Sequence, residues 1–118
     1  MSLLGCKELY FLLDSDDAVI AFQEKEQSWA GALAFSNEDL ANRFLEASHL
    51  DASEIVAIDT EDLPNLRTLV SSLKRRPIRY LLLDLDYHSG ACRQVDFEGD
   101  GLGTVRERQF VAVRAHQR

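Results

Sequence analysis

The stretch from Arg79 to Gly90, RYLLLDLDYHSG, is the part of the sequence that best predicts the fold. It follows Pro77 and holds four leucines within five residues, so the pattern predicts a buried strand. Two aspartates, a histidine and a glycine then give this strand a polar tip. The segments on either side of it predict the other elements of the fold.

A strand and a helix are predicted at Trp29–Phe35 and Asn37–Ser48. The first segment is apolar, and we expect Trp29 to lie in the core. The hydrophobic period then changes at Ser36, which suits a helix N-cap, and Glu38 places negative charge in the first turn. One apolar face at helical spacing consists of Leu40, Ala41, Phe44 and Leu45.

The same order of strand and helix repeats between Glu54 and Arg76. The apolar centre of Glu54–Asp59 predicts a short buried strand. Pro64 suits the first turn of the helix that follows, and Pro77 prevents its continuation. The buried stripe of this helix, at positions i, i+3, i+4 and i+7, consists of Leu66, Leu69, Val70 and Leu73.

An antiparallel hairpin is predicted near the amino terminus. The apolar segments Lys7–Leu13 and Ala18–Phe22 are separated by the run Asp14–Asp17. Asp and Ser in such a run hydrogen-bond their own backbone, so we expect a turn there.

A second hairpin is predicted near the carboxyl terminus. Strands at Cys92–Phe97 and Phe110–Arg114 flank the glycine-rich link Glu98–Gly103. We expect the second strand to begin after Thr104.

These elements predict one domain over residues 1–118, of the α/β or α+β class, built on a single mixed β-sheet. Its two helices come from consecutive β-α-β units. The strands that begin at Trp29, Glu54 and Arg79 should be parallel, with right-handed connections, and the hairpins at both ends of the chain add antiparallel strands. We expect at least one face of the sheet to be covered by both helices.

The composition indicates an acidic protein of one domain. Thirteen basic and twenty acidic residues give a formal charge of −7, which repels nucleic acid and anionic membranes. No apolar run approaches the roughly 20 residues that span a bilayer, and the amino terminus lacks a signal-peptide pattern. Cys6 and Cys92 are too few and too far apart for a disulfide framework, which favours free thiols in the cytoplasm.

The polar tip holds the residues best suited to chemistry. Alternation along an extended strand would put Asp84, Asp86 and His88 on one side, at the end of the sheet where ligands bind. With Asp59 from the preceding strand they are candidate ligands for Mg²⁺ or Mn²⁺. The alternative is that these residues emerge into solvent as the strand ends. No catalytic set and no cofactor-binding motif accompanies them.

The order Asp84-Leu-Asp-Tyr-His88 invites comparison with the haloacid-dehalogenase superfamily, whose nucleophile lies in the pattern Asp-x-Asp-x-Thr/Ser. Only the two aspartates match, because His88 occupies the position of the hydroxyl residue and Ser89 comes one place too late. A nucleophile without activating and metal-binding groups cannot transfer a phosphoryl group. We therefore exclude this superfamily.

The segment Asp96–Glu107 is similar to the calcium loop of an EF-hand. Gly101 stands at the position of the sharp turn. The flanking segments are predicted as strands, whereas an EF-hand is flanked by helices, so a hairpin turn is the alternative. The carboxylates of this candidate loop are Asp96, Glu98, Asp100 and Glu107.

The segment Leu33–Glu38, leading to Phe44 and Leu45, resembles the strand-to-helix junction of the SseB amino-terminal domain family. The resemblance extends from Trp29 to Asp86. It implies a small binding or secretion-associated module without catalytic residues.

The sequence therefore predicts a noncatalytic cytoplasmic domain. We expect it to bind a protein partner, or a second copy as a homodimer, through a sheet edge or an uncovered sheet face. The alternative is a small metal-dependent enzyme or cation binder that uses Asp84, Asp86 and His88.

Overall fold

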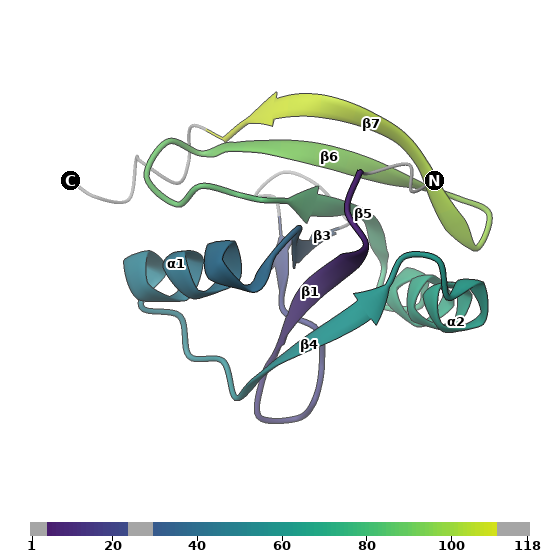
Figure 1. Ribbon diagram of the computed structural model, residues 1–118, viewed down its shortest axis with the longest axis horizontal. Coiled ribbons are helices and arrows are strands. Elements are labelled where there is room, and N and C mark those ends of the chain that lie inside the picture. The colour runs from purple at the N-terminus through teal and green to yellow at the C-terminus, as the bar shows by residue number, and fades with distance from the viewer. Residues whose placement is uncertain (1–4, 24–29, 111–118) are drawn as a thin grey trace.

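The structure is a computed structural model that describes residues 5–23 and 30–110. One mixed sheet of seven strands with two helices confirms the predicted fold class (Figure 1). Trp29 and the segment 111–118 lie outside the described residues. In chain order, the elements are β1 Glu8–Leu13, β2 Ala21–Gln23, β3 Ala30–Phe35, α1 Glu38–Ser48, β4 Glu54–Asp59, α2 Leu63–Lys74, β5 Ile78–Leu83, β6 Ala91–Glu98 and β7 Gly101–Gln109.

The strands lie in the order β4-β1-β3-β5-β6-β7, and β2 pairs with β3 beside this path. β3 and β5 form the parallel pair, with Leu33 opposite Leu82. β1 is antiparallel to both β3 and β4, so β3, β4 and β5 run in the same direction, as the crossovers predicted. β4 is not their neighbour, however, because β1 lies between β3 and β4. The insertion of β1 moves β4 to the edge of the sheet.

The hairpin near the amino terminus changes partner as it returns. Leu13 bridges Val19, and the Asp14 carboxylate accepts the backbone N–H groups of Asp16 (2.8 Å) and Ala18 (3.1 Å), which confirms the predicted turn. β2 then leaves β1 and pairs with the first half of β3. The second half of β3 pairs with β1.

The two helices cover opposite faces of the sheet, which corrects the expectation of a shared face. Phe44 of α1 packs in a core cluster with Leu33 and Leu82, whereas Leu73 of α2 packs in a second cluster with Leu81. Successive residues of a strand point to opposite faces, so the two clusters lie on the two sides of the sheet. The connection through α1 moves outward to β4 and the connection through α2 moves back. Two right-handed crossovers in opposite directions place their helices on opposite faces. Neither helix is long and apolar enough to cross a membrane.

The hairpin near the carboxyl terminus is tighter than predicted. Glu98 pairs with Gly101, so β7 begins directly after a two-residue turn rather than after Thr104. Gly99 in this turn has a φ of 61°, a conformation that glycine adopts without strain. β7 ends at Gln109, before the predicted strand, whose first residue Phe110 is buried outside any strand.

Candidate functional site

The carboxylate of Asp84, the first residue after β5, accepts three hydrogen bonds. Its backbone has a φ of 56°, so the extended conformation ends there. Its carboxylate accepts the Ser36 backbone N–H at 2.7 Å and the Ser36 hydroxyl at 2.8 Å. The Arg93 guanidinium donates to it at 3.3 Å, and the Asp84 side chain is only 21% exposed. This carboxylate therefore ties the end of β5 to the end of β3.

This contact occupies the place where a parallel sheet usually binds its ligand. The carboxyl ends of β3 and β5 lie side by side, and α1 begins beside them with Asn37 as its N-cap. Anionic ligands commonly bind in such a crevice, on backbone N–H groups near a helix N-terminus. Here the Asp84 carboxylate takes the Ser36 N–H instead. The crevice is thus used for structure.

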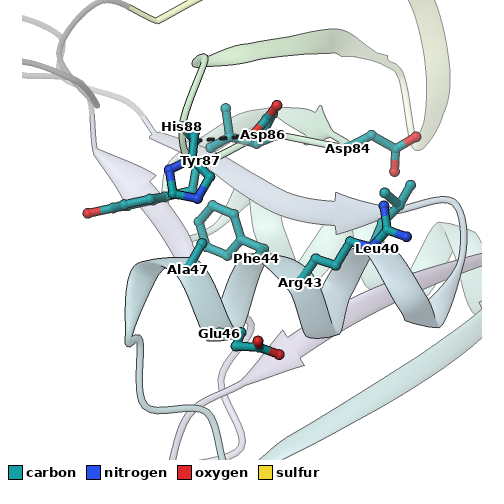
Figure 2. A pocket seen from close by; sticks show the side chains of 10 residues that line it. Leu40, Arg43, Phe44, Glu46, Ala47, Asp84, Asp86, Tyr87 and His88 are labelled. Carbon is teal, nitrogen blue, oxygen red and sulfur yellow. Dashed lines mark hydrogen bonds between the residues drawn. The ribbon is translucent and has the colours of Figure 1, made fainter.

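The prediction that Asp84, Asp86 and His88 share one side of a strand is wrong, because β5 ends at Leu83. The following residues form a turn. The Asp86 carboxylate accepts the His88 backbone N–H at 3.0 Å, and the Gly90 N–H donates to the Asp86 carbonyl at 2.7 Å. The three side chains consequently diverge (Figure 2).

A groove of about 460 Å³ lies between this turn and α1. Figure 2 shows Asp84 at one end of the groove and Tyr87 and His88 at the other. The Phe44 and Tyr87 rings meet edge to face, with centroids 5.9 Å apart. The groove can accept an apolar side chain. It is lined by Leu40, Arg43, Phe44, Glu46, Ala47, Asp84, Leu85, Asp86, Tyr87 and His88.

The fourth predicted metal ligand, Asp59, lies far from the other three in the sheet. It ends β4, opposite Glu8 of β1, and its carboxylate accepts the Glu61 N–H at 2.8 Å. β1 and β3 separate it from β5. Among residues 5–23 and 30–110, no three His, Cys, Asp or Glu side chains gather as they would around a metal ion. Metal binding stays a prediction, without a ligand set brought together by the fold.

The candidate calcium loop is part of the β6–β7 hairpin, as the alternative interpretation of a hairpin turn predicted. The Asp96 carboxylate accepts from the Gln94 side-chain amide at 2.7 Å and pairs with Arg106 at 3.5 Å. Glu107 lies opposite Arg93, farther along the hairpin. Paired strands hold these carboxylates along a ladder, whereas an EF-hand loop wraps them around the ion.

Cys6, which precedes β1, has an unreactive environment. Burial raises the pKa of the Cys6 thiol, and the nearby Asp84 carboxylate raises it further, while Arg93 acts in the opposite direction. A raised pKa lowers the thiolate fraction at any given pH below it, and the thiolate is the reactive form.

We expect Cys6 to react with iodoacetamide at pH 8 more slowly in the folded protein than in the chain unfolded by guanidinium, because the raised pKa lowers the thiolate fraction. Cys92 is buried and would complicate the measurement, so the variant Cys92→Ala isolates Cys6. The folded rate should rise as the pH is increased toward 10. Equal rates in the folded and unfolded chain at pH 8 would contradict the raised pKa.

β4 is an open edge strand of apolar composition. It pairs only with β1, over all six residues and without a register shift. The sequence ELYFLL of β1 is largely buried, whereas no residue of β4 is buried. The prediction of a buried strand at Glu54–Asp59 is therefore wrong in burial, although its bounds are correct. Figure 1 shows β4 as the outermost strand on its side of the sheet.

The backbone of β4 directs hydrogen-bonding groups outward. The Thr60 N–H donates to the Lys7 carbonyl at 2.8 Å. This hydrogen bond, together with the register of the two strands, determines which residues of β4 direct their backbone groups toward β1. By the alternation of an antiparallel ladder, Ile55, Ala57 and Asp59 then point their N–H groups to the open side. The carbonyls of Ile55 and Ala57 point the same way, while that of Asp59 accepts the Asp62 N–H at 3.1 Å.

The opposite edge, β7, is protected. The register shifts between Val95 and Phe97 of β6, which marks a bulge where the hairpin bends. A run of alternating charge also lies on β7, namely Arg106, Glu107 and Arg108. Bulges and charges are the usual means of preventing an edge from pairing with another chain. β4, with the sequence EIVAID, has no bulge, lysine or proline, and its two charged residues stand only at its ends.

Sequence reasoning missed β4 as a site because two consecutive crossovers predicted an interior strand. The available signal was the acidic residue at each end of a very short apolar run, which is typical of an edge.

Comparison of the chain with protein-family models, with curated proteins and with solved structures gives no match.

Proposed function

We propose that this protein is a noncatalytic interaction domain that binds an extended segment of a partner protein along the free edge of β4. The observation that carries the proposal is the contrast between the two strands at the ends of the order β4-β1-β3-β5-β6-β7, since β7 is protected and β4 is open. Binding would add a strand to the sheet, with main-chain hydrogen bonds supplying affinity. The proposed binding surface, β4 with its outward N–H and carbonyl groups, is called the β4 edge below.

The β4 edge offers enough hydrogen bonds for modest affinity. Each protein hydrogen bond contributes about 1 kcal/mol net, and the outward groups of Ile55, Ala57 and Asp59 form a short ladder. Contacts with apolar side chains would add to this. Two large exposed apolar residues lie near the ends of β4: Leu50, in the connection before it, is 38% exposed, and Leu63, the first residue of α2, is 52% exposed.

The noncatalytic part of the proposal is supported by the use made of Asp84. Asp84 begins the run of polar residues that, in the sequence, is best suited to chemistry. In the fold its carboxylate accepts hydrogen bonds from Ser36 and Arg93. Two cysteines far apart in the sequence are too few for a disulfide framework and favour a reducing compartment, so we propose that the domain acts in the cytoplasm. A small binding module is also what the SseB resemblance implies, and membership of that family is proposed on the same grounds.

Replacing Ala57 with proline should weaken strand addition about tenfold while leaving the fold intact. Proline removes the outward N–H of Ala57 and places a ring in the path of the added strand, but it breaks no hydrogen bond with β1. The measurement is titration with a soluble strand-forming peptide, followed by NMR at the amide resonances of Ile55, Ala57 and Asp59. Slower hydrogen exchange at these amides should accompany binding to the parent protein.

The matched control is Ala57→Thr, which retains the N–H and suits a strand. It should bind like the parent protein. Undiminished binding by Ala57→Pro, or shifts at the β5 turn without shifts in β4, would refute strand addition at this edge.

A further inference from the structure

We infer that the segment accepted by the β4 edge carries lysine or arginine at both ends of an apolar centre. This inference rests on the proposed function and adds the chemistry of the partner. It follows from the charges that surround the edge, from the absence of ion pairs to them among the described residues, and from the apolar character of the strand between them.

Acidic residues flank β4 at both ends. Asp51 and Glu54 lie at its start, and both are exposed. Asp59, Glu61 and Asp62 lie at its end, where Glu61 is exposed and the two aspartates are partly exposed. The centre, Ile55–Ile58, carries no charge.

These acids are not neutralised by the fold. The ion pairs between described residues join Arg43 to Asp39, Arg93 to Asp84 and Arg106 to Asp96, and all three lie away from β4. Lys7, which precedes β1, accepts the Thr60 N–H on its carbonyl, so one cation stands against the three acids at the end of β4. The β4 edge thus combines unpaired backbone groups with an unbalanced negative charge at each end. A basic segment complements both features, since opposite charges across an interface favour encounter and fix its register.

The same charges disfavour a second copy of this chain as the occupant. Antiparallel pairing of two β4 strands places the start of one beside the end of the other, and parallel pairing places like ends together. Because both ends are acidic, every arrangement brings Glu54 near acidic residues of the second copy. Like charges on paired strands are destabilising. We therefore assign the edge to a different protein segment.

Three peptides with a Val-Thr-Val-Thr-Val centre and two Lys, two Gln or two Glu residues at each end test the inference. Calorimetric titration of the whole chain at low salt should give a dissociation constant about tenfold lower for the Lys peptide than for the Gln peptide. The Glu peptide should bind most weakly. Raising the salt to 0.5 M should remove most of the difference, because exposed charges are then screened.

The double variant Glu54→Gln and Glu61→Gln identifies the source of the preference. Both side chains are exposed, so the fold should not change, and the variant should bind the Lys and Gln peptides with dissociation constants within about threefold. The control, Glu46→Gln on α1, changes an exposed carboxylate that lines the groove beside the turn after β5 and should keep the full preference.

The outcomes separate the inference from the proposed function. Equal binding of the Lys and Gln peptides would overturn the basic partner and leave strand addition standing. No binding of any peptide would overturn the proposed function itself. A dimer in sedimentation experiments without peptide, lost in Ala57→Pro, would show that a second copy is the occupant and would also overturn the inference.

Discussion

Replacing Gly90 with alanine is expected to lower the free energy of unfolding by about 4 kcal/mol or more, a large part of the stability of an ordinary domain. A Cβ at this position would lie 1.9 Å from the Phe110 carbonyl oxygen and 2.9 Å from its carbonyl carbon. These are backbone atoms, and the Phe110 N–H also donates to the Gly90 carbonyl at 2.8 Å. The contact can be relieved only by separating the two segments. Chemical denaturation measures the effect.

Gly99→Ala is the matched control for this substitution. Gly90 and Gly99 both have positive φ, 78° and 61°, so alanine costs each of them about 1–2 kcal/mol of backbone strain. An added Cβ at Gly99 meets nothing within 4 Å. The difference between the two variants therefore measures the Phe110 contact. Equal losses would show that Phe110 does not approach Gly90 in solution.

Asp84→Ala is expected to lower the free energy of unfolding by about 3 kcal/mol. The substitution removes three charge-assisted hydrogen bonds, two to Ser36 and one to Arg93. Such bonds contribute about 1.5–3 kcal/mol each when buried, and the 21% exposure of this side chain reduces the sum. Thermal and denaturant unfolding should agree on the loss.

Asp86→Ala, two residues further along, is the control for Asp84. Its carboxylate accepts one exposed backbone N–H, from His88, so the loss should be below about 1 kcal/mol. Ser36→Ala should reproduce part of the Asp84 effect, because it removes only the hydroxyl bond. If Asp84→Ala and Asp86→Ala were equally mild, Asp84 would not join β3 to β5 in the way described above.

The elements were predictable where local chemistry determines them. The stripe that ends at Leu73 is a short-range pattern, and α1 and α2 begin and end within about two residues of the predicted bounds, although the N-cap of α1 is Asn37 and not the predicted Ser36. The apolar run of β5 is likewise a local property. The Asp14 turn was predictable because its side chain bonds backbone groups only two and four residues away.

Pairing between distant segments was not predictable. β1 lies between β3 and β4 although more than forty residues separate Leu9 from its partner Ile58, and no local pattern records that choice. The predicted burial of β4 was wrong for this reason, since its apolar centre suits an interior strand as well as an edge. The predicted arrangement of Asp84, Asp86 and His88 was wrong for a different reason. Asp84 leaves the extended conformation, which the alternation rule cannot anticipate.

The bulge in the β6–β7 hairpin limits the number of partner strands that one molecule can bind. If both end strands of the sheet were open, one could pair with a strand of a second molecule and the other with a strand of a third. Such pairing could continue from molecule to molecule. Here the register shift at Val95–Phe97 and the charges of β7 close one side. Complexes at the β4 edge should then contain one segment per chain at any concentration, and a bound sheet should end instead of growing into a fibre.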